Sequence, residues 1–221
     1  MGAFAIRAPR ASQRRRVVME AGVATALGLA LAAGFNAWAT ALVFGACARI
    51  FPTMLGGPLA AFFGSAPILT LAAILFAAEF LADKLPFLDH FWNFAHTFLR
   101  PAAGAAMAAA CLPAHGTAAR AGIAIVGAFV TLAAHLGKAA SRLTSTAAVS
   151  GGSRLALSLA EDVIAVCVAA VAIFSPELSL AVVGAVLVLV VLLFGRVRRA
   201  AAILFFLAAH PRKALRASRE A

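Results

Sequence analysis

Six long apolar runs constrain this chain more than any other feature of its sequence. A helix of about 20 apolar residues crosses the ~30 Å hydrocarbon core of a bilayer. Within that core only helices and closed barrels satisfy all their backbone hydrogen bonds. We therefore predict an all-α membrane protein with about six transmembrane helices. The runs cover residues 21–48, 67–85, 91–112, 121–136, 155–174 and 178–194.

The composition leaves little of the chain outside these runs. The 221 residues are 64% hydrophobic and 12% charged, whereas soluble domains carry about 25% charged residues. We divide the chain into a basic arm (residues 1–20), a transmembrane domain (residues 21–195) and a basic tail (residues 196–221). A short apolar run within the tail, residues 203–209, predicts a helix lying on the membrane surface.

The net charge of +11 comes mostly from the two ends of the chain. Basic flanks of apolar spans set topology and bind anionic headgroups, so this charge indicates a bilayer surface as partner and not a nucleic acid. Six crossings with both termini in the cytoplasm place 16 Lys and Arg residues on that side and two on the other. We expect an integral protein of a bacterial inner membrane, whose many small residues would also permit a homodimer.

Two of the runs contain residues that interrupt helices. The first carries Gly34-Phe35-Asn36 in its middle, and the third carries Arg100-Pro101. Proline removes a backbone hydrogen bond and disfavours helix at the preceding residue, so we expect one or two broken helices. Such breaks line cavities and often mark transporter binding sites. A short match between residues 31–37 and 132–138, in spans expected to run in opposite directions, is compatible with a three-plus-three inverted repeat.

Ionisable residues cluster where the second and third runs meet. Each costs about 2.5–3.5 kcal/mol at the centre of a bilayer, so we expect them to be functional. Glu79 and Asp83 share one helix face and indicate a proton or cation site, to which we assign Asp89 as well. Arg100 beside a helix that starts at Pro101 predicts an anion or phosphate site.

A second acidic pair lies at a similar predicted depth in the fifth run. Glu161 and Asp162 are expected to face Glu79, with Lys138 between them, and to form a buried ion network. The alternative is a structural salt bridge between the second and fifth spans. The candidate substrate- or ion-binding residues are therefore Glu79, Asp83, Asp89, Arg100, Lys138, Glu161 and Asp162.

Several membrane chemistries have no motif in this sequence. The zinc pattern HExxH, the Walker phosphate loop and the intramembrane protease patterns GxSG and GxGD do not occur. Cys47, Cys111 and Cys167 are isolated within apolar runs and have no metal-ligand spacing. We therefore assign no catalytic residue, metal ligand or cofactor, and an enzyme is disfavoured.

Four segments resemble an uncharacterised family of bacterial and plant membrane proteins, domain of unknown function four-one-two-six. They are GFNAW (34–38), EFLADKLPFLD (79–89), TFLRPAAG (97–104) and SLAED (158–162). The resemblance covers about residues 20–200. It implies a polytopic membrane fold in which these charged positions belong to the family pattern, and it implies no activity.

Three functions remain open from the sequence. The first is a small transporter or channel, coupled to protons or a cation, that handles an anionic or lipid-phosphate substrate at Arg100. The second is a membrane scaffold or assembly factor that transports nothing, in which the buried charges are structural ion pairs. The third is a lipid-modifying enzyme with an unfamiliar motif.

Overall fold

The computed structural model describes residues 11–82, 86–145 and 151–192, together with positions 195, 198, 199, 202 and 205. Within these residues, side chains are described from residue 18 onward, except at 82, 86–93, 140–145 and 151–155. All regular structure in this part of the chain is helical, as predicted. The helices are α1 (Ala11–Phe35), α2 (Ala37–Ile50), α3 (Pro58–Phe63), α4 (Ala66–Ala82), α5 (Pro86–Ala110), α6 (Thr117–Ser145), α7 (Gly151–Phe174) and α8 (Pro176–Leu192).

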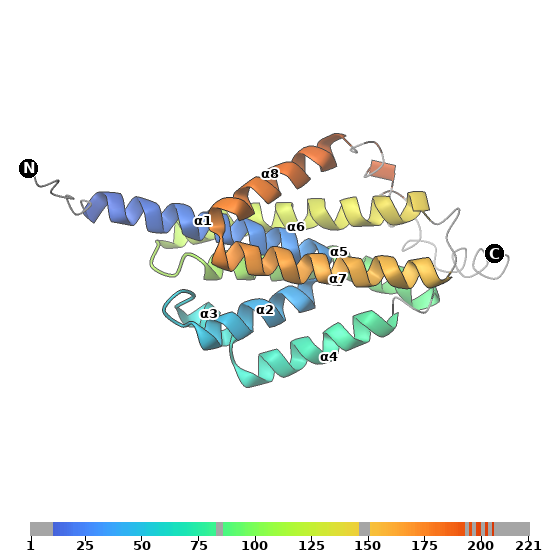
Figure 1. Ribbon diagram of the computed structural model, residues 1–221, viewed down its shortest axis with the longest axis horizontal. Coiled ribbons are helices and arrows are strands. Elements are labelled where there is room, and N and C mark those ends of the chain that lie inside the picture. The colour runs from blue at the N-terminus through green and yellow to red at the C-terminus, as the bar shows by residue number, and fades with distance from the viewer. Residues whose placement is uncertain are drawn as a thin grey trace, which may run out of the picture.

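Five of the six predicted spans correspond to single helices, α4 to α8, which run back and forth along one bundle (Figure 1). We call the end of the bundle where α1 begins the amino end, and the end where α8 finishes the carboxyl end. The stretches long and apolar enough to cross a membrane are Val18–Phe35, Thr117–Ala139 and Ala156–Phe174, while α2, α4 and α8 are shorter apolar helices. These helices indicate a membrane protein, but they do not confirm six crossings.

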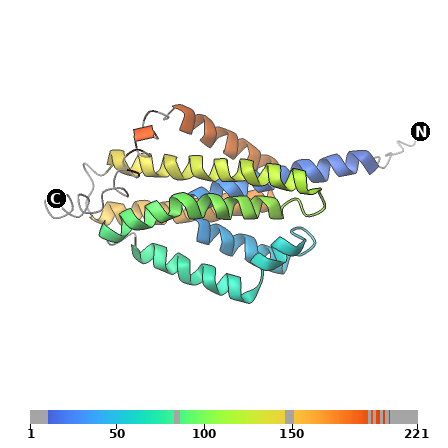
Figure 2. The same cartoon turned by 180° about the vertical axis from the view of Figure 1, so that it is seen from behind.

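The first apolar run forms a hairpin of two helices. α1 enters from the amino end and stops inside the bundle, and α2 returns toward the amino end (Figures 1 and 2). Ala48 at the end of α2 accordingly packs in one apolar cluster with Ala110 at the end of α5. The predicted interruption at Gly34-Phe35-Asn36 is confirmed, since α1 ends at Phe35 and α2 begins at Ala37. The two pieces do not form one crossing as expected, because 28 apolar residues are also enough for two antiparallel helices that turn inside the bundle.

The hairpin also changes the expected topology. α1 begins at the amino end and α8 finishes at the carboxyl end (Figure 1). The prediction that both termini lie on one side is therefore not supported, because the hairpin replaces one of the six crossings. Of the predicted surface helix at residues 203–209, the structure describes only Phe205, which is helical and exposed.

The two segments proposed as a repeat lie side by side. Thr131 donates a hydrogen bond of 2.7 Å from Oγ1 to the Ala30 carbonyl, and seven residues later Lys138 donates one of 2.8 Å from Nζ to the Phe35 carbonyl. The contacted residue on α1 moves from Ala30 to Phe35 as the contacting residue on α6 moves from Thr131 to Lys138, so the two helices run in the same direction. An inverted repeat requires opposite directions for this pair and is not confirmed.

The predicted break at Arg100-Pro101 was also wrong. α5 is one helix from Pro86 to Ala110, with Pro101 in its interior. Proline is tolerated in helices of this kind because neighbouring helices and local adjustments satisfy the freed backbone groups. The half-helix terminus that suggested an anion site is consequently not formed.

α1 occupies the centre of the bundle and packs against α5, α6, α7 and α8. Its inner face is built from small residues, of which Ala26, Ala30 and Ala33 are completely buried. A Cβ on Gly34 would lie only 2.7 Å from the Thr131 carbonyl oxygen, so α6 approaches the end of α1 more closely than any other residue there would allow. This close packing brings side chains from α5 and α6 to the last turn of α1.

Candidate functional site

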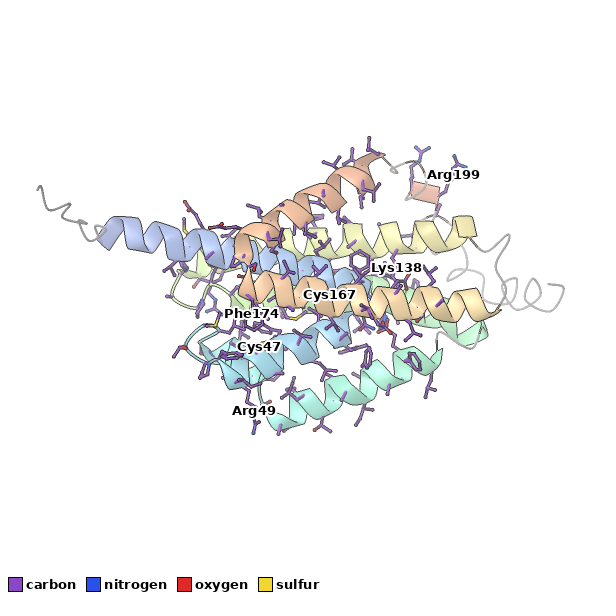
Figure 3. All side chains as sticks on the ribbon, viewed as in Figure 1. Cys47, Arg49, Lys138, Cys167, Phe174 and Arg199 are labelled. Atoms are coloured by element: carbon purple, nitrogen blue, oxygen red, sulfur yellow. The ribbon has the colours of Figure 1, made fainter. Side chains whose placement is uncertain are left out.

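A layer of polar and charged side chains surrounds the tip of the α1–α2 hairpin inside the bundle. Four helices, α4 to α7, and the hairpin turn contribute to this buried polar layer, and all of its members except Asp162, which is half-buried, are less than a tenth exposed. Lys138 of α6 marks the level of the layer in Figure 3. The layer consists of Asn36, Glu79, His96, Arg100, His135, Lys138, Glu161 and Asp162.

Two cations cap the last turn of α1. Nη1 of Arg100 donates to the Gly34 carbonyl at 2.8 Å, and Nζ of Lys138 donates to the Phe35 carbonyl at the same distance. The last carbonyls of a helix lack partners within the helix and form the negative end of its dipole. The two side chains therefore satisfy carbonyls that would otherwise be unpaired inside an apolar bundle.

Asn36 forms the hairpin turn. Its Oδ1 accepts hydrogen bonds from the backbone N–H groups of Trp38 and Ala39 at 3.0 and 2.9 Å, which caps the first turn of α2. Its Nδ2 donates to Oδ1 of Asp162 on α7 at 2.8 Å. The Asn36 side chain thus caps the first turn of α2 and links the hairpin turn to α7 by a hydrogen bond.

Glu79 and Arg100 form a buried ion pair between α4 and α5. Nη2 of Arg100 donates to Oε1 of Glu79. His96 faces the same oxygen, with its Nδ1 3.5 Å away. The indole nitrogen of Trp38, which can only donate, lies 3.3 Å from Nε2 of His96. Since Nε2 must accept, a neutral His96 ring carries its hydrogen on Nδ1 and presents it to the Glu79 carboxylate.

His135 extends this network from α6. Its Nδ1 lies 3.1 Å from Nη1 of Arg100, and its Nε2 lies 3.3 Å from Oγ1 of Thr97. A guanidinium has no acceptor, so Nδ1 must accept and a neutral ring carries its hydrogen on Nε2. The fork of Arg100 therefore joins α1, α4 and α6 through three different groups.

A second ion pair links α6 to α7. Nζ of Lys138 lies 2.9 Å from Oε2 of Glu161. With neutral histidines, the layer holds the carboxylates of Glu79, Glu161 and Asp162 against the cations of Arg100 and Lys138. The described members of the layer thus carry one negative charge in excess.

Two buried atoms of the first ion pair are unsatisfied. Oε2 of Glu79 and Nε of Arg100 have no hydrogen-bond partner among the described residues, although both atoms are inaccessible to solvent. A buried polar atom without a partner costs about 1–3 kcal/mol, and more when it is charged. Oε2 of Glu79 is therefore a position where a proton, a water molecule or a cation would be stabilised, and the N–H group at Nε of Arg100 could donate to a water molecule or an anion.

The structure brings five of the seven predicted site residues together. They are Glu79, Arg100, Lys138, Glu161 and Asp162. Asp83 lies outside the described residues, and Asp89 falls in α5 where only the backbone is described. No group of three or more His, Cys, Asp or Glu side chains suited to a metal ion occurs among the described residues.

Sequence reasoning missed the parts of the site that carry no fixed charge. Asn36 was predicted only as a helix interruption, and Trp38, His96 and His135 were not among the predicted site residues. The signal for Asn36 and Trp38 was the GFNAW segment, where an amide stands in the middle of an apolar run, and His135 lies outside that segment. His96 carried no distinguishing signal.

An all-helical bundle with membrane-length helices and a layer of buried charges defines a polytopic membrane protein. Residues 23–196 match the model of the family described as domain of unknown function (DUF4126), and the chain belongs to this family. No curated protein matches the chain, and no solved structure matches it.

Proposed function

We propose that this protein is a small membrane transporter or channel, driven by or selective for protons or a cation. The observation that carries the proposal is the hairpin tip, where two helices end inside the bundle among buried charges. Irregular backbone at membrane depth is tolerated where it is buried in protein or lines a cavity. Ionisable side chains at that depth commonly mark ion pathways and proton relays.

Glu79 is the residue best placed to bind the transported or coupling ion. One of its oxygens is held by Arg100, while the other is buried with no partner among the described residues. This unpartnered carboxylate oxygen favours a proton or cation at this point. His96, which accepts a hydrogen bond from Trp38, faces the same oxygen that Arg100 holds.

An anionic substrate at Arg100 stays a prediction with less support. Three of the groups that Arg100 contacts belong to the protein itself: the Gly34 carbonyl, Nδ1 of His135 and Glu79. An incoming phosphate would have to displace the Glu79 carboxylate or bind at the remaining Nε atom. The contacts therefore favour a positioning role for Arg100.

Proton flux into proteoliposomes tests the proposal. Liposomes with an internal pH-sensitive dye are energised by a K⁺ gradient and valinomycin, and acidification is compared with that of protein-free liposomes. We expect flux with the wild type, loss of flux with Glu79→Gln, and wild-type flux with Glu177→Gln. Glu177 is an exposed acid in the first turn of α8, so its variant removes the same charge away from the layer.

Two results would overturn the role of Glu79. One is equal proton flux in Glu79→Gln and wild type. If the wild type conducts Na⁺ or K⁺ in place of protons, the other is equal flux of that cation in the two proteins, measured with radioactive tracers. Size-exclusion profiles of the variants establish that they are folded, since Glu79→Gln also weakens the ion pair with Arg100.

A second candidate function is a membrane scaffold. It is favoured by the two ion pairs, which connect α4 to α5 and α6 to α7 as structural cross-links would. Wild-type proteoliposomes that are no more permeable to protons, Na⁺ or K⁺ than empty liposomes would favour the scaffold over the transporter.

A further inference from the structure

A groove lies between α4 and α7, beside the buried polar layer. Its volume is about 420 Å³, in the range of pockets that hold small molecules. Among the described residues, its lining comes from these two helices alone: Phe76 and Phe80 from α4, and a stretch from Leu159 to Cys167 from α7. Figure 3 shows Cys167 on α7.

The α1–α2 hairpin leaves the space that forms this groove. α2 packs against both α4 and α7, so it separates them where it is present. It begins only at Ala37, and the preceding residue Asn36 contacts α7 at Asp162. α4 and α7 continue toward the carboxyl end beyond the start of α2 (Figure 1). The groove therefore begins beside the first turn of α2 and extends to where α2 no longer separates the two helices.

The surface of the groove is almost wholly apolar. Asp162 borders the groove, but its carboxylate bonds to Asn36 at the hairpin tip and supplies no polar wall. Phe76 and Phe80 are four residues apart, so their rings lie on the same face of α4. Apolar cavities stay dry and take up apolar molecules. The lining thus favours an uncharged apolar occupant.

The groove opens at the lipid-facing surface of the bundle. Leu159 and Val163, which line it, are exposed. They belong to Ala156–Phe174, a stretch of α7 long and apolar enough to cross a membrane. In lipid, van der Waals packing decides which helix surfaces are covered, because no water has to be excluded. An empty groove loses contacts that a hydrocarbon chain would make with its walls.

The direction of the groove matches that of the chains in a bilayer. Along α7 its lining extends from Leu159 to Cys167, about 12 Å at 1.5 Å per residue. α7 is a membrane-length helix, so the groove runs across the bilayer as acyl chains do. A chain from the surrounding lipid can therefore enter from the side without turning.

We propose that the groove binds one acyl chain of a membrane phospholipid. The chain would fill the space between α4 and α7, with Phe76 and Phe80 against one side of it. Glu79 follows Phe76 by three residues and precedes Phe80, so the bound chain would support the helix segment that carries Glu79. The inference is independent of the proposed function, since a transporter and a scaffold would bind the chain alike.

Photocrosslinking in detergent micelles tests the groove, because detergent dilutes the lipids at the open surface of the protein. The probe is a phosphatidylcholine with a diazirine in the middle of one acyl chain, added in small amount to the purified full-length protein. Adducts are mapped by mass spectrometry after proteolysis. We expect the α4 and α7 segments to carry several-fold more label than α8, whose residues do not line the groove.

Val163→Phe and Val188→Phe provide matched variants. Both valines are 60% exposed, but only Val163 lines the groove. They lie at a similar depth, because each is two residues from a side chain, Glu161 or Val190, that meets consecutive residues of α6. The larger ring at position 163 takes up part of the groove. We expect Val163→Phe to reduce labelling of α4 and α7 to the level of α8, and Val188→Phe to label as the wild type does.

Competition identifies the part of the lipid that is bound. Excess unlabelled phosphatidylcholine should remove the label from α4 and α7. Glycerophosphocholine has the same headgroup and no acyl chain, so it should leave the label in place. Competition by glycerophosphocholine would overturn the proposal, because the headgroup would then be the bound part.

Two further results would overturn the proposal. One is equal labelling of α7 and α8 in the wild type, since the probe would then contact the protein only as bulk detergent does. The other is undiminished labelling of α4 and α7 in Val163→Phe. If Val163→Phe does not elute as a single species in size-exclusion chromatography, Cys167→Phe repeats the test at another wall of the groove.

Discussion

At the scale of single residues, Asn36 is the position on which the hairpin depends. It caps α2 through Oδ1 and holds Asp162 through Nδ2. Few residues do both, because a cap needs an acceptor and Asp162 needs a donor. Aspartate would keep the cap but place a second carboxylate against Asp162.

Asn36→Ala should destabilise the protein. Loss of the cap costs about 1 kcal/mol, and a buried partner left without its hydrogen bond adds about 1–3 kcal/mol. Thermal unfolding in detergent, followed by circular dichroism, measures the effect. Ser65→Ala removes a hydroxyl that makes only an exposed bond to the Phe62 carbonyl, and should unfold at nearly the wild-type temperature. An Asn36→Ala midpoint as high as that of Ser65→Ala would contradict the role of the cap.

The pair of Lys138 and Glu161 gives a second test at this scale. Lys138→Met removes the cation from a buried ion pair and from the Phe35 carbonyl, which should cost about 3–5 kcal/mol. Adding Glu161→Gln should recover part of that loss, because the uncompensated carboxylate is then gone. The same unfolding measurement on the two single variants and the double variant gives the coupling energy. Additive losses in the double variant would mean that the two side chains do not interact.

At the scale of helices, close packing of α1 on α6 sets the geometry of the layer. A Cβ on Gly34 would meet the backbone of α6 at Thr131. Displacing α6 would separate His135 and Lys138 from the groups they hold. Gly122, on the same helix α6, has open space where a Cβ would be added.

Gly34→Ala and Gly122→Ala should therefore have opposite effects on stability. Gly34→Ala forces α1 and α6 apart and should cost about 1–3 kcal/mol, as overpacked interiors do. Gly122→Ala should be neutral or stabilising by up to about 1 kcal/mol, since alanine favours helix. A Gly34→Ala protein as stable as Gly122→Ala would show that the helices are not in such close contact.

The sequence predicted the charged residues of the layer better than their arrangement. Glu79, Arg100, Lys138, Glu161 and Asp162 were identifiable because charges within apolar runs are rare and costly. The hairpin was not, because 28 apolar residues fit one interrupted crossing as well as two antiparallel helices. The contacts that stabilise the turn come from Arg100, Lys138 and Asp162, far along the chain from Asn36. The break predicted at Pro101 was wrong for a related reason, since neighbouring helices decide whether a proline interrupts a helix.

At the scale of the whole molecule, the hairpin sets which groups lie on the same side of the membrane. In the bundle, the start of α1 and the α7–α8 turn lie at the amino end, and the end of α6 lies at the carboxyl end (Figures 1 and 2). A single crossing by residues 21–48 would place the start of α1 opposite the α7–α8 turn. The proposed site requires the hairpin, in which the start of α1 and the α7–α8 turn lie at the same end of the bundle.

Cysteine accessibility across the membrane distinguishes these arrangements most directly. Single cysteines at Ser12, Ser175 and Ser145 are introduced after Cys47, Cys111 and Cys167 are replaced by alanine. Each protein is reconstituted in one orientation and treated with a membrane-impermeant maleimide from either side. The hairpin predicts that Ser12→Cys and Ser175→Cys react from the same side, and Ser145→Cys from the other. Reaction of Ser12→Cys together with Ser145→Cys would contradict the hairpin and the buried site built on it.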